Sequence, residues 1–234
     1  MNKKISIAID GPAGAGKTTI ARKLADKLGY IYIDTGAMYR AVAWKAENHG
    51  IPLMDEDAIV HVAGSMEIEF SENGSQICAD GVDITKAIRT PEITKLSSPV
   101  SAIPGVRRYL VALQRAMAEE GGVIMEGRDI GSVVMPNAQV KVFLTASAQE
   151  RARRRHEELL AAGMNIDIGV LKKEIEERDH RDTTRKDSPL VQASGAVVID
   201  TDGMDIDEVV ERILGLYEEQ GIKICSEPIL DTCG

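Results

Sequence analysis

The chain has 234 residues, of which 44% are hydrophobic and 28% charged, so it can bury a sizeable core without disulfide or metal staples. Only 3% of the residues are aromatic and the net charge is −9, which disfavours a base-stacking platform and a long nucleic-acid partner. No apolar run approaches the ~18 residues of a membrane-spanning helix.

The N-terminus has no signal-peptide pattern, and the three cysteines, Cys78, Cys225 and Cys233, are odd in number and lack metal-ligand spacing. We therefore expect reduced thiols in a cytoplasmic protein. The acidity is confined to residues 187–234, where 2 basic and 11 acidic side chains give 2 − 11 = −9. A local basic pocket for a small anion remains compatible with this distribution.

Strand-type and helix-type segments alternate along most of the chain. Buried-type strands are predicted over 5–9, 30–33, 122–125, 140–144 and 196–199. Helices are predicted over 17–28, 36–48, 55–63, 106–119, 147–162, 168–184 and 205–219. This alternation is typical of an α/β fold with three α/β/α layers around a central parallel sheet.

The pattern changes over 64–100. Residues 66–71 alternate between apolar and polar side chains, the turn signals Glu72–Ser75 and Asp80–Gly81 follow, and short strands are predicted at 76–79 and 82–84. The segment is therefore expected to be a small antiparallel β insertion.

The first strand is followed by Gly11-x-x-x-x-Gly16-Lys17-Thr18, which fits the phosphate-loop pattern in full. Its glycines allow the backbone N–H groups to point inward, and the helix that begins near Lys17 adds positive potential for phosphates. Lys17 is expected to neutralise β/γ-phosphate oxygens, and the Thr18 hydroxyl to hold Mg²⁺. The expected ATP-binding residues are Gly11, Pro12, Ala13, Gly14, Ala15, Gly16, Lys17, Thr18 and Thr19.

A phosphate loop alone is compatible with a transferase, a hydrolytic switch or a motor. In the segment Asp34–Arg40, Thr35 begins a helix directly after a strand, and Arg40 lies one turn further on, where it can clamp a second phosphate. A capped helix with a surface arginine explains the same residues equally well.

The segment Glu126–Gly131 also follows a predicted strand. Here Arg128 can meet a phosphate and Asp129 can accept a hydrogen bond from an exocyclic amine, although a turn with an internal ion pair is the alternative.

Two helical segments carry further arginines. Arg178, Arg181 and Arg185 share one helix face, and Arg151 and Arg155 lie one turn apart. Such arginines can close over transferring phosphates, and a solvated helix with intrahelical ion pairs is the alternative.

Taken together, residues 10–18, 34–40, 127–131 and 178–185 resemble the bacterial cytidylate kinase family of nucleoside monophosphate kinases, and the resemblance runs from about residue 3 to 219. It implies transfer of the γ-phosphoryl group of ATP to CMP or dCMP, with Mg²⁺. It further implies catalytic roles for Lys17, Arg128, Arg178 and the lid residues Arg151 and Arg155. The implied acceptor-binding residues are Thr35, Arg40, Ser98, Arg107, Arg128, Asp129, Arg178, Asp182 and Arg185.

The resemblance also implies a division of the chain. The core covers 1–63, 101–149 and 187–220; the monophosphate-binding insertion covers 64–100, a helical lid 150–186 and a tail 221–234. A monomer is expected. Asp34 is a candidate Mg²⁺ carboxylate by position only.

Two alternatives remain. One is a monophosphate kinase for UMP or AMP, or a small-metabolite kinase. The other is a GTPase-like switch, for which the sequence lacks a guanine-reading Asn-Lys-x-Asp segment.

Overall fold

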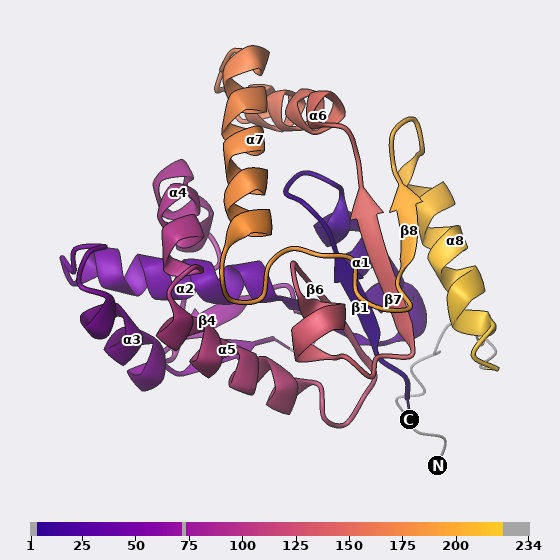
Figure 1. Ribbon diagram of the computed structural model, residues 1–234, viewed down its shortest axis with the longest axis horizontal. Helices are drawn as coiled ribbons and strands as arrows, with labels where there is room; N and C mark the ends of the chain where they lie inside the picture. Colours follow the sequence, from indigo (N-terminus) through magenta and orange to yellow (C-terminus); the bar gives the residue numbers. More distant parts are fainter. Residues whose placement is uncertain (1–3, 72–73, 222–234) are drawn as a thin grey trace, which may run out of the picture.

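The central sheet has five parallel strands. A computed structural model describes residues 4–71 and 74–221, and Figure 1 shows its arrangement. The strands are β1 (Ile7–Asp10), β2 (Ile31–Asp34), β6 (Val123–Gly127), β7 (Val140–Thr145) and β8 (Val197–Asp200). Their order across the sheet is β2-β6-β1-β7-β8, which places β1 in the middle with Asp10 beside Gly127 and Phe143.

Helices cover both faces of this sheet. Successive strand residues point to opposite faces, so Ile7 and Ile9 pack against α1 (Lys17–Leu28) and α8 (Ile206–Glu218). Ala8 instead packs into the cluster formed with α5 (Pro104–Met117) and the π-helical turn Ile130–Val134. The predicted three-layer α/β/α fold is confirmed.

The insertion holds a second sheet. Its strands β3 (Ile68–Phe70), β4 (Ile77–Ala79) and β5 (Val82–Asp83) are antiparallel in the order β3-β4-β5. The antiparallel sheet is therefore confirmed, although residues 72 and 73 of the predicted turn lie outside the described residues. The sheet shares a hydrophobic core with α2 (Thr35–Asn48), α3 (Glu56–Ser65) and part of α5.

A helix that the sequence analysis did not predict follows these strands. The Thr90 side chain caps α4 (Pro91–Val100) by accepting from the Ile93 N–H at 3.3 Å, and Pro91 occupies the first turn, where no N–H is needed. The run Ser97-Ser98-Pro99 resembles a loop in the sequence, yet Pro99 sits within the last turn of the helix. Burial of Ile93 and Val100 in the insertion core outweighs these local preferences.

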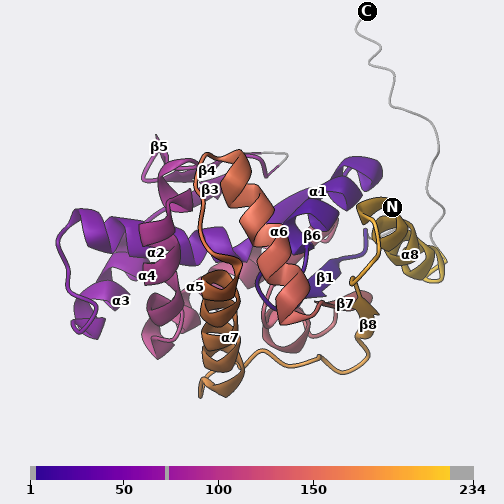
Figure 2. The same cartoon turned by 90° about the horizontal axis from the view of Figure 1, so that it is seen from above.

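Two antiparallel helices, α6 (Ala148–Ala161) and α7 (Ile168–Thr184), pack on one another through Ala152, Leu159 and Leu171. In Figure 1 they stand above the carboxyl ends of the strands. Figure 2 shows them between the α2–α4 group and the strands β1, β7 and β8. The two predicted helices are therefore present, at a place where they can cover a site at that sheet edge.

Two expectations concern chemistry outside this core. Within the described residues, no helix has both the length and the apolar character that crossing a bilayer requires. Cys78 is a half-buried free thiol, whereas Cys225, Cys233 and the predicted tail beyond Gly221 lie outside the described residues.

Candidate active site

A cleft of about 1280 Å³ opens at the carboxyl ends of β1, β2 and β6. This is the edge at which open α/β sheets bind ligands. The predicted residues that line it are Ala13, Gly14, Ala15, Gly16, Lys17, Thr18, Thr19, Thr35, Arg40, Ser98, Arg107, Arg128, Asp129, Arg155, Arg178, Asp182 and Arg185. Segments far apart in the sequence therefore meet in one site.

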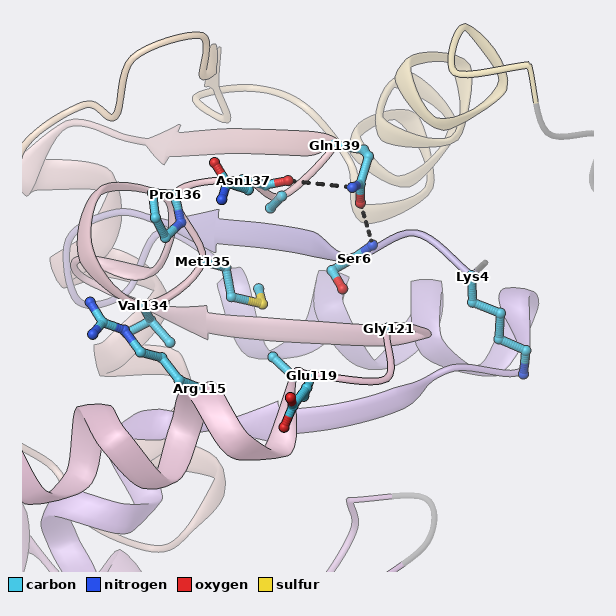
Figure 3. Close-up of a pocket in the computed structure, with 12 residues that line it drawn as sticks. Lys4, Ser6, Arg115, Glu119, Gly121, Val134, Met135, Pro136, Asn137 and Gln139 are labelled. Carbon is cyan, nitrogen blue, oxygen red and sulfur yellow. Dashed lines mark hydrogen bonds between the residues drawn. The ribbon is translucent and has the colours of Figure 1, made fainter. Parts of the chain in front are cut away.

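A second, smaller cavity of about 300 Å³ lies at the opposite edge of the sheet, between Lys4, Arg115 and Gln139 (Figure 3). The Gln139 side chain accepts from the Ser6 N–H at 2.9 Å and donates to the Asn137 carbonyl. None of the predicted site residues lines this cavity, and its amide groups serve the local structure.

The phosphate loop is shaped by its glycines. Gly11 has φ = +148°, and a Cβ atom there would lie 2.1 Å from the Leu144 carbonyl oxygen, so β7 leaves no room for a side chain. Gly16 precedes α1 in a left-handed conformation. The Lys17 ammonium, on the first turn of α1, folds back and donates to the Pro12 carbonyl at 2.7 Å. The backbone of the loop thus lies around the Lys17 side chain.

Lys17 is buried among other cations. Burial lowers the pKa of its ammonium well below the usual range, and the nearby Arg128 and Arg178 lower it further. Arg178 has a pKa lowered to about 10, mainly by burial and then by Arg128. Lys17 forms no ion pair among the residues that the structure describes, so the cleft carries excess positive charge beside the loop.

Two carboxylates, Asp34 and Asp182, form ion pairs with the arginines near Lys17. Asp34 accepts from Arg40 at 2.7 Å, and Asp182 accepts from the Arg128 Nε at 2.8 Å. The Arg178 Nε lies 4.0 Å from the same Asp182 oxygen. The Nε atoms of Arg40 and Arg178 are buried without hydrogen-bond partners. Unsatisfied guanidinium groups of this kind suit phosphate oxygens.

A buried ion pair, Arg107–Asp129, also lines the cleft. Arg107 on α5 donates to Asp129, the two side chains are 4% and 7% exposed, and the Arg185 Nη2 lies 3.6 Å from the other Asp129 oxygen. The Arg107 guanidinium also lies 5.4 Å from the ring centroid of Tyr39, a cleft residue that the sequence analysis missed. The sequence pattern does not indicate a binding role for Tyr39, because its spacing is that of a core residue of its helix.

The resemblance implies Ser98, and the adjacent Ser97 is the alternative at the same place; the two serines differ in their contacts. The Ser97 hydroxyl donates to the Thr94 carbonyl at 2.8 Å within α4, whereas the Ser98 Oγ is buried without a partner. Both residues line the cleft. Ser98 is therefore the one of the two with an unpaired hydroxyl, and its role in binding stays a prediction.

Asp10 carries a role that the sequence analysis did not assign. Its carboxylate accepts from the Ile130 and Gly131 N–H groups, both at 2.7 Å, while burial raises its pKa to about 6. These bonds tie the end of β1 to the turn that begins at Asp129. A buried acid at the end of a strand, just ahead of a glycine loop, is the signal that could have identified it.

A buried carboxylate, Glu126, stands beside the loop at the end of β6. Burial and then the charge of Asp34 raise its pKa, and Lys17, Tyr32 and Thr18 act in the opposite direction. The Tyr32 hydroxyl donates to Glu126 at 2.5 Å. The Glu126 side chain lines the cleft and forms no ion pair among the described residues. Asp34 differs, because its two oxygens accept from Ala37 and Arg40.

The lid arginines occupy different positions. Arg151 does not line the cleft; it donates to the loop carbonyl of Ala13 at 3.2 Å and pairs with Asp179 at 2.6 Å. Arg155 is half-buried, lines the cleft and pairs with Glu158 at 3.1 Å.

Arg154, which the sequence analysis did not single out, lines the cleft. It donates to the Thr201 carbonyl at 2.7 Å and hydroxyl at 3.1 Å. It belongs to a run of five residues, 151–155, that holds four arginines, and the sequence alone does not show which of them reach the cleft.

The geometry therefore joins two groups of basic residues in one cleft. The glycine loop and Lys17 form one, and Arg40, Arg128 and Arg178 form the other. Such a cleft can hold two phosphorylated molecules with their phosphates facing one another.

Comparisons with known proteins agree with this arrangement. The model of the family "Cytidylate kinase" matches residues 7–219. The cytidylate kinase of Desulforamulus reducens is 54% identical over 220 residues, which cover 94% of this chain and 99% of that protein. The cytidylate kinase of Ligilactobacillus salivarius is 50% identical over 222 residues, with 94% and 99% covered.

One solved structure, that of an uncharacterized protein from Eubacterium ventriosum, superposes with a TM-score of 0.50 at 14% identity, covering 93% of this chain and 99% of that one. That likeness concerns the fold alone. The family model matches residues 7–219 and both relatives align with 94% of this chain, and these findings confirm the resemblance found in the motifs. By its sequence along nearly its whole length, this chain belongs to the cytidylate kinase family.

Proposed function

We propose that the protein transfers the γ-phosphoryl group of ATP to the 5′-phosphate of CMP or dCMP, giving ADP and CDP or dCDP. The observation that carries the proposal is the buried Arg107–Asp129 pair, which lines the same cleft as the glycine loop. A base-reading pair and a triphosphate cradle then face one reaction centre. Membership of the family supports the same activity.

The pair accounts for selection of cytosine. A carboxylate such as that of Asp129 accepts from the 4-amino group, and a guanidinium such as that of Arg107 donates to N3 and O2. Uracil would set its 4-oxo group against Asp129 and leave buried polar groups unpaired, which discriminates by up to ~10⁴-fold in such sites. The unpartnered Ser98 hydroxyl is placed to add a further hydrogen bond.

The acceptor phosphate belongs between Arg40, Arg128 and Arg178, and Thr35 opens α2 at the same place. The Thr35 hydroxyl donates to the Glu126 carbonyl at 2.7 Å and the Ala37 N–H donates to Asp34, and the N-terminus of α2 adds positive potential toward the anion. Asp182 holds Arg128, and we assign it and Arg185 to the sugar side of the acceptor.

We assign the donor base to the other end of the cleft. That end is lined by Ile20, Arg154, Thr201, Met204 and Ile206. Apolar side chains beside an arginine and backbone carbonyl groups suit a purine ring.

The residues beside the loop fit Mg²⁺. The Thr18 hydroxyl and the Glu126 carboxylate are oxygen donors of the kind that Mg²⁺ prefers, and Glu126 is a buried carboxylate with no ion-pair partner among the described residues. Asp34 has both oxygens occupied, so we assign the carboxylate role to Glu126 instead. When bound, the ion would neutralise charge on the β- and γ-phosphates.

Catalysis then rests on positioning and charge. Lys17 holds the β/γ oxygens, and Arg128 and Arg178 hold the acceptor phosphate in line with them, so the approach of two polyanions is no longer opposed by repulsion. The acceptor phosphate is already ionised and needs no strong base. The helices α6 and α7 exclude water, which limits ATP hydrolysis. Arg151 supports the loop through the Ala13 carbonyl.

Activity with CMP, dCMP, UMP, AMP and shikimate, measured side by side as ADP production, tests the assignment. We expect CMP and dCMP to have kcat/KM values far above the others. Asp129→Ala should reduce the CMP-to-UMP ratio. A high ratio that survives this substitution would exclude the base-reading role of Asp129, and wild-type preference for another acceptor would exclude the proposed activity.

We propose a monomer as the active form, since one chain supplies both the glycine loop and the arginines of the acceptor site. Size-exclusion chromatography with light scattering tests this directly.

A further inference from the structure

We propose that Tyr32 is a positioning residue that fixes the Glu126 carboxylate for the metal ion. The inference rests on the proposed function, because Glu126 serves there as the carboxylate beside Thr18. Tyr32 lies on β2 and belongs to no motif that the sequence analysis identified.

Tyr32 and Glu126 lie on one face of the sheet. In the parallel register Asp34 is opposite Glu126 and Tyr32 is opposite Ile124, so the tyrosine is a diagonal neighbour of the carboxylate. The Tyr32 hydroxyl donates to Glu126 Oε1 at 2.5 Å, and the side chain of Tyr32 is fully buried. A phenolic hydroxyl can donate, whereas an ionised carboxylate can only accept, so the direction of this hydrogen bond is from Tyr32 to Glu126.

The ring has little freedom to move. The Arg22 guanidinium, on α1, lies 5.2 Å from the ring centroid. On the other side the insertion closes against the strand at Gly74. A Cβ atom on Gly74 would lie 2.0 Å from the Tyr32 carbonyl oxygen and 3.0 Å from its Cδ1 atom. The hydroxyl is therefore held at a fixed point above the end of β6.

A fixed hydrogen-bond donor restricts the position of the Glu126 carboxylate. The three side-chain torsions of a glutamate give its carboxylate considerable freedom, and the nearby Asp34 charge repels it. With Oε1 held by Tyr32, the second oxygen is left for the loop side, where Thr18 lies. Without the hydroxyl the carboxylate loses its neutral donor and can rotate. Outer-shell partners of metal ligands typically contribute 10–100-fold in metal affinity.

The variant Tyr32→Phe removes only the hydroxyl, and the chain offers a matched control. Tyr30, which precedes the same strand, shares a hydrogen bond of 3.0 Å with the Tyr217 hydroxyl, far from the cleft. Tyr30→Phe therefore removes a comparable hydroxyl without touching Glu126.

The test is the affinity for Mn²⁺, measured by electron paramagnetic resonance on the full-length enzyme with a non-hydrolysable ATP analogue. We expect Tyr32→Phe to weaken Mn²⁺ binding about 10-fold, and Tyr30→Phe to leave it within twofold of wild type. In a Glu126→Gln background, Tyr32→Phe should add less than twofold, because the tyrosine acts through the carboxylate.

An unchanged Mn²⁺ affinity in Tyr32→Phe, alongside weakened binding in Glu126→Gln, overturns the inference and leaves the proposed function in place. Unchanged affinity in Glu126→Gln as well overturns both the inference and the Glu126 assignment. Thermal unfolding of each variant separates these outcomes from a loss of fold. Failure of the proposed function is a different result, the absence of CMP phosphorylation by the wild-type enzyme.

Discussion

The lysine of the glycine loop should make the stability of the empty enzyme depend on pH. Lys17 is 7% exposed, and burial followed by Arg128 lowers its pKa to about 7, whereas in an unfolded chain it titrates near 10.4. Well below pH 7 the lysine is charged in both states, and the folded state bears the full penalty of the buried ammonium. As the pH rises from about 7 to 10, the folded state releases the proton first, so the penalty falls and stability rises.

The size of the effect follows from proton linkage. One proton difference between the unfolded and folded states changes the free energy of unfolding by about 1.4 kcal/mol per pH unit. Between pH 7.5 and 9 the wild type should therefore gain about 1–2 kcal/mol relative to Lys17→Met, in which this proton is absent. All other lysines are common to both proteins and cancel in the comparison.

Urea denaturation at several pH values measures the difference, with fluorescence of the single tryptophan, Trp44 in α2, as the signal. We also expect Lys17→Met to fold normally and to lose phosphoryl transfer. Two results would refute the view that Lys17 is a buried cation without an ion-pair partner. One is a difference in stability that stays constant between pH 7.5 and 9. The other is a wild type that loses stability relative to the variant as the pH rises.

Three further predictions concern the arginine clamp, the loop and the base site. Asp182→Asn leaves Arg128 without its carboxylate partner, and we expect a loss of about 3 kcal/mol in unfolding free energy and a raised KM for CMP; unchanged urea midpoints would contradict this. Gly11→Ala places a Cβ atom 2.1 Å from a carbonyl oxygen of β7 and should lower stability by about 3 kcal/mol, whereas Gly29→Ala, with open space around it, should cost about 1 kcal/mol; equal losses on thermal unfolding would contradict the steric reason. Ser98→Ala should raise the KM for CMP several-fold while Ser97→Ala does not, and steady-state kinetics in which both variants match wild type would remove Ser98 from the site.

Much of the fold could be predicted from the sequence because its signals are local. The helix after the loop was predicted over the same residues, Lys17–Leu28, since its apolar spacing and the stop at Gly29 agree. The strands that pack on both faces are short runs of β-branched residues, so their existence was clear and only their ends shifted. The helix α4 was missed because its stability comes from the insertion core and its sequence contains a serine pair and a proline.

Some residues of the candidate site could be predicted from the sequence, and others could not. Residues in motifs at strand ends, such as Thr35, Arg128 and Asp129, were found because chain position indicates the sheet edge. Glu126 lies in the same motif, but its burial and its contact with Tyr32 depend on strand order, which the sequence does not state. The Arg151 side chain could not be placed either, because which arginine of α6 faces the cleft is decided by the rotation of that helix.

The helix α2 has its first turn at the central sheet and its body in the hydrophobic core of the insertion. Thr35 and Arg40 are thus carried by the same rigid body as α3, α4 and the antiparallel strands. Any swing of that body about the end of β2 separates Arg40 from Arg128, which stays with the sheet. A single movement about the end of β2 would then both open the cleft and release the diphosphate product.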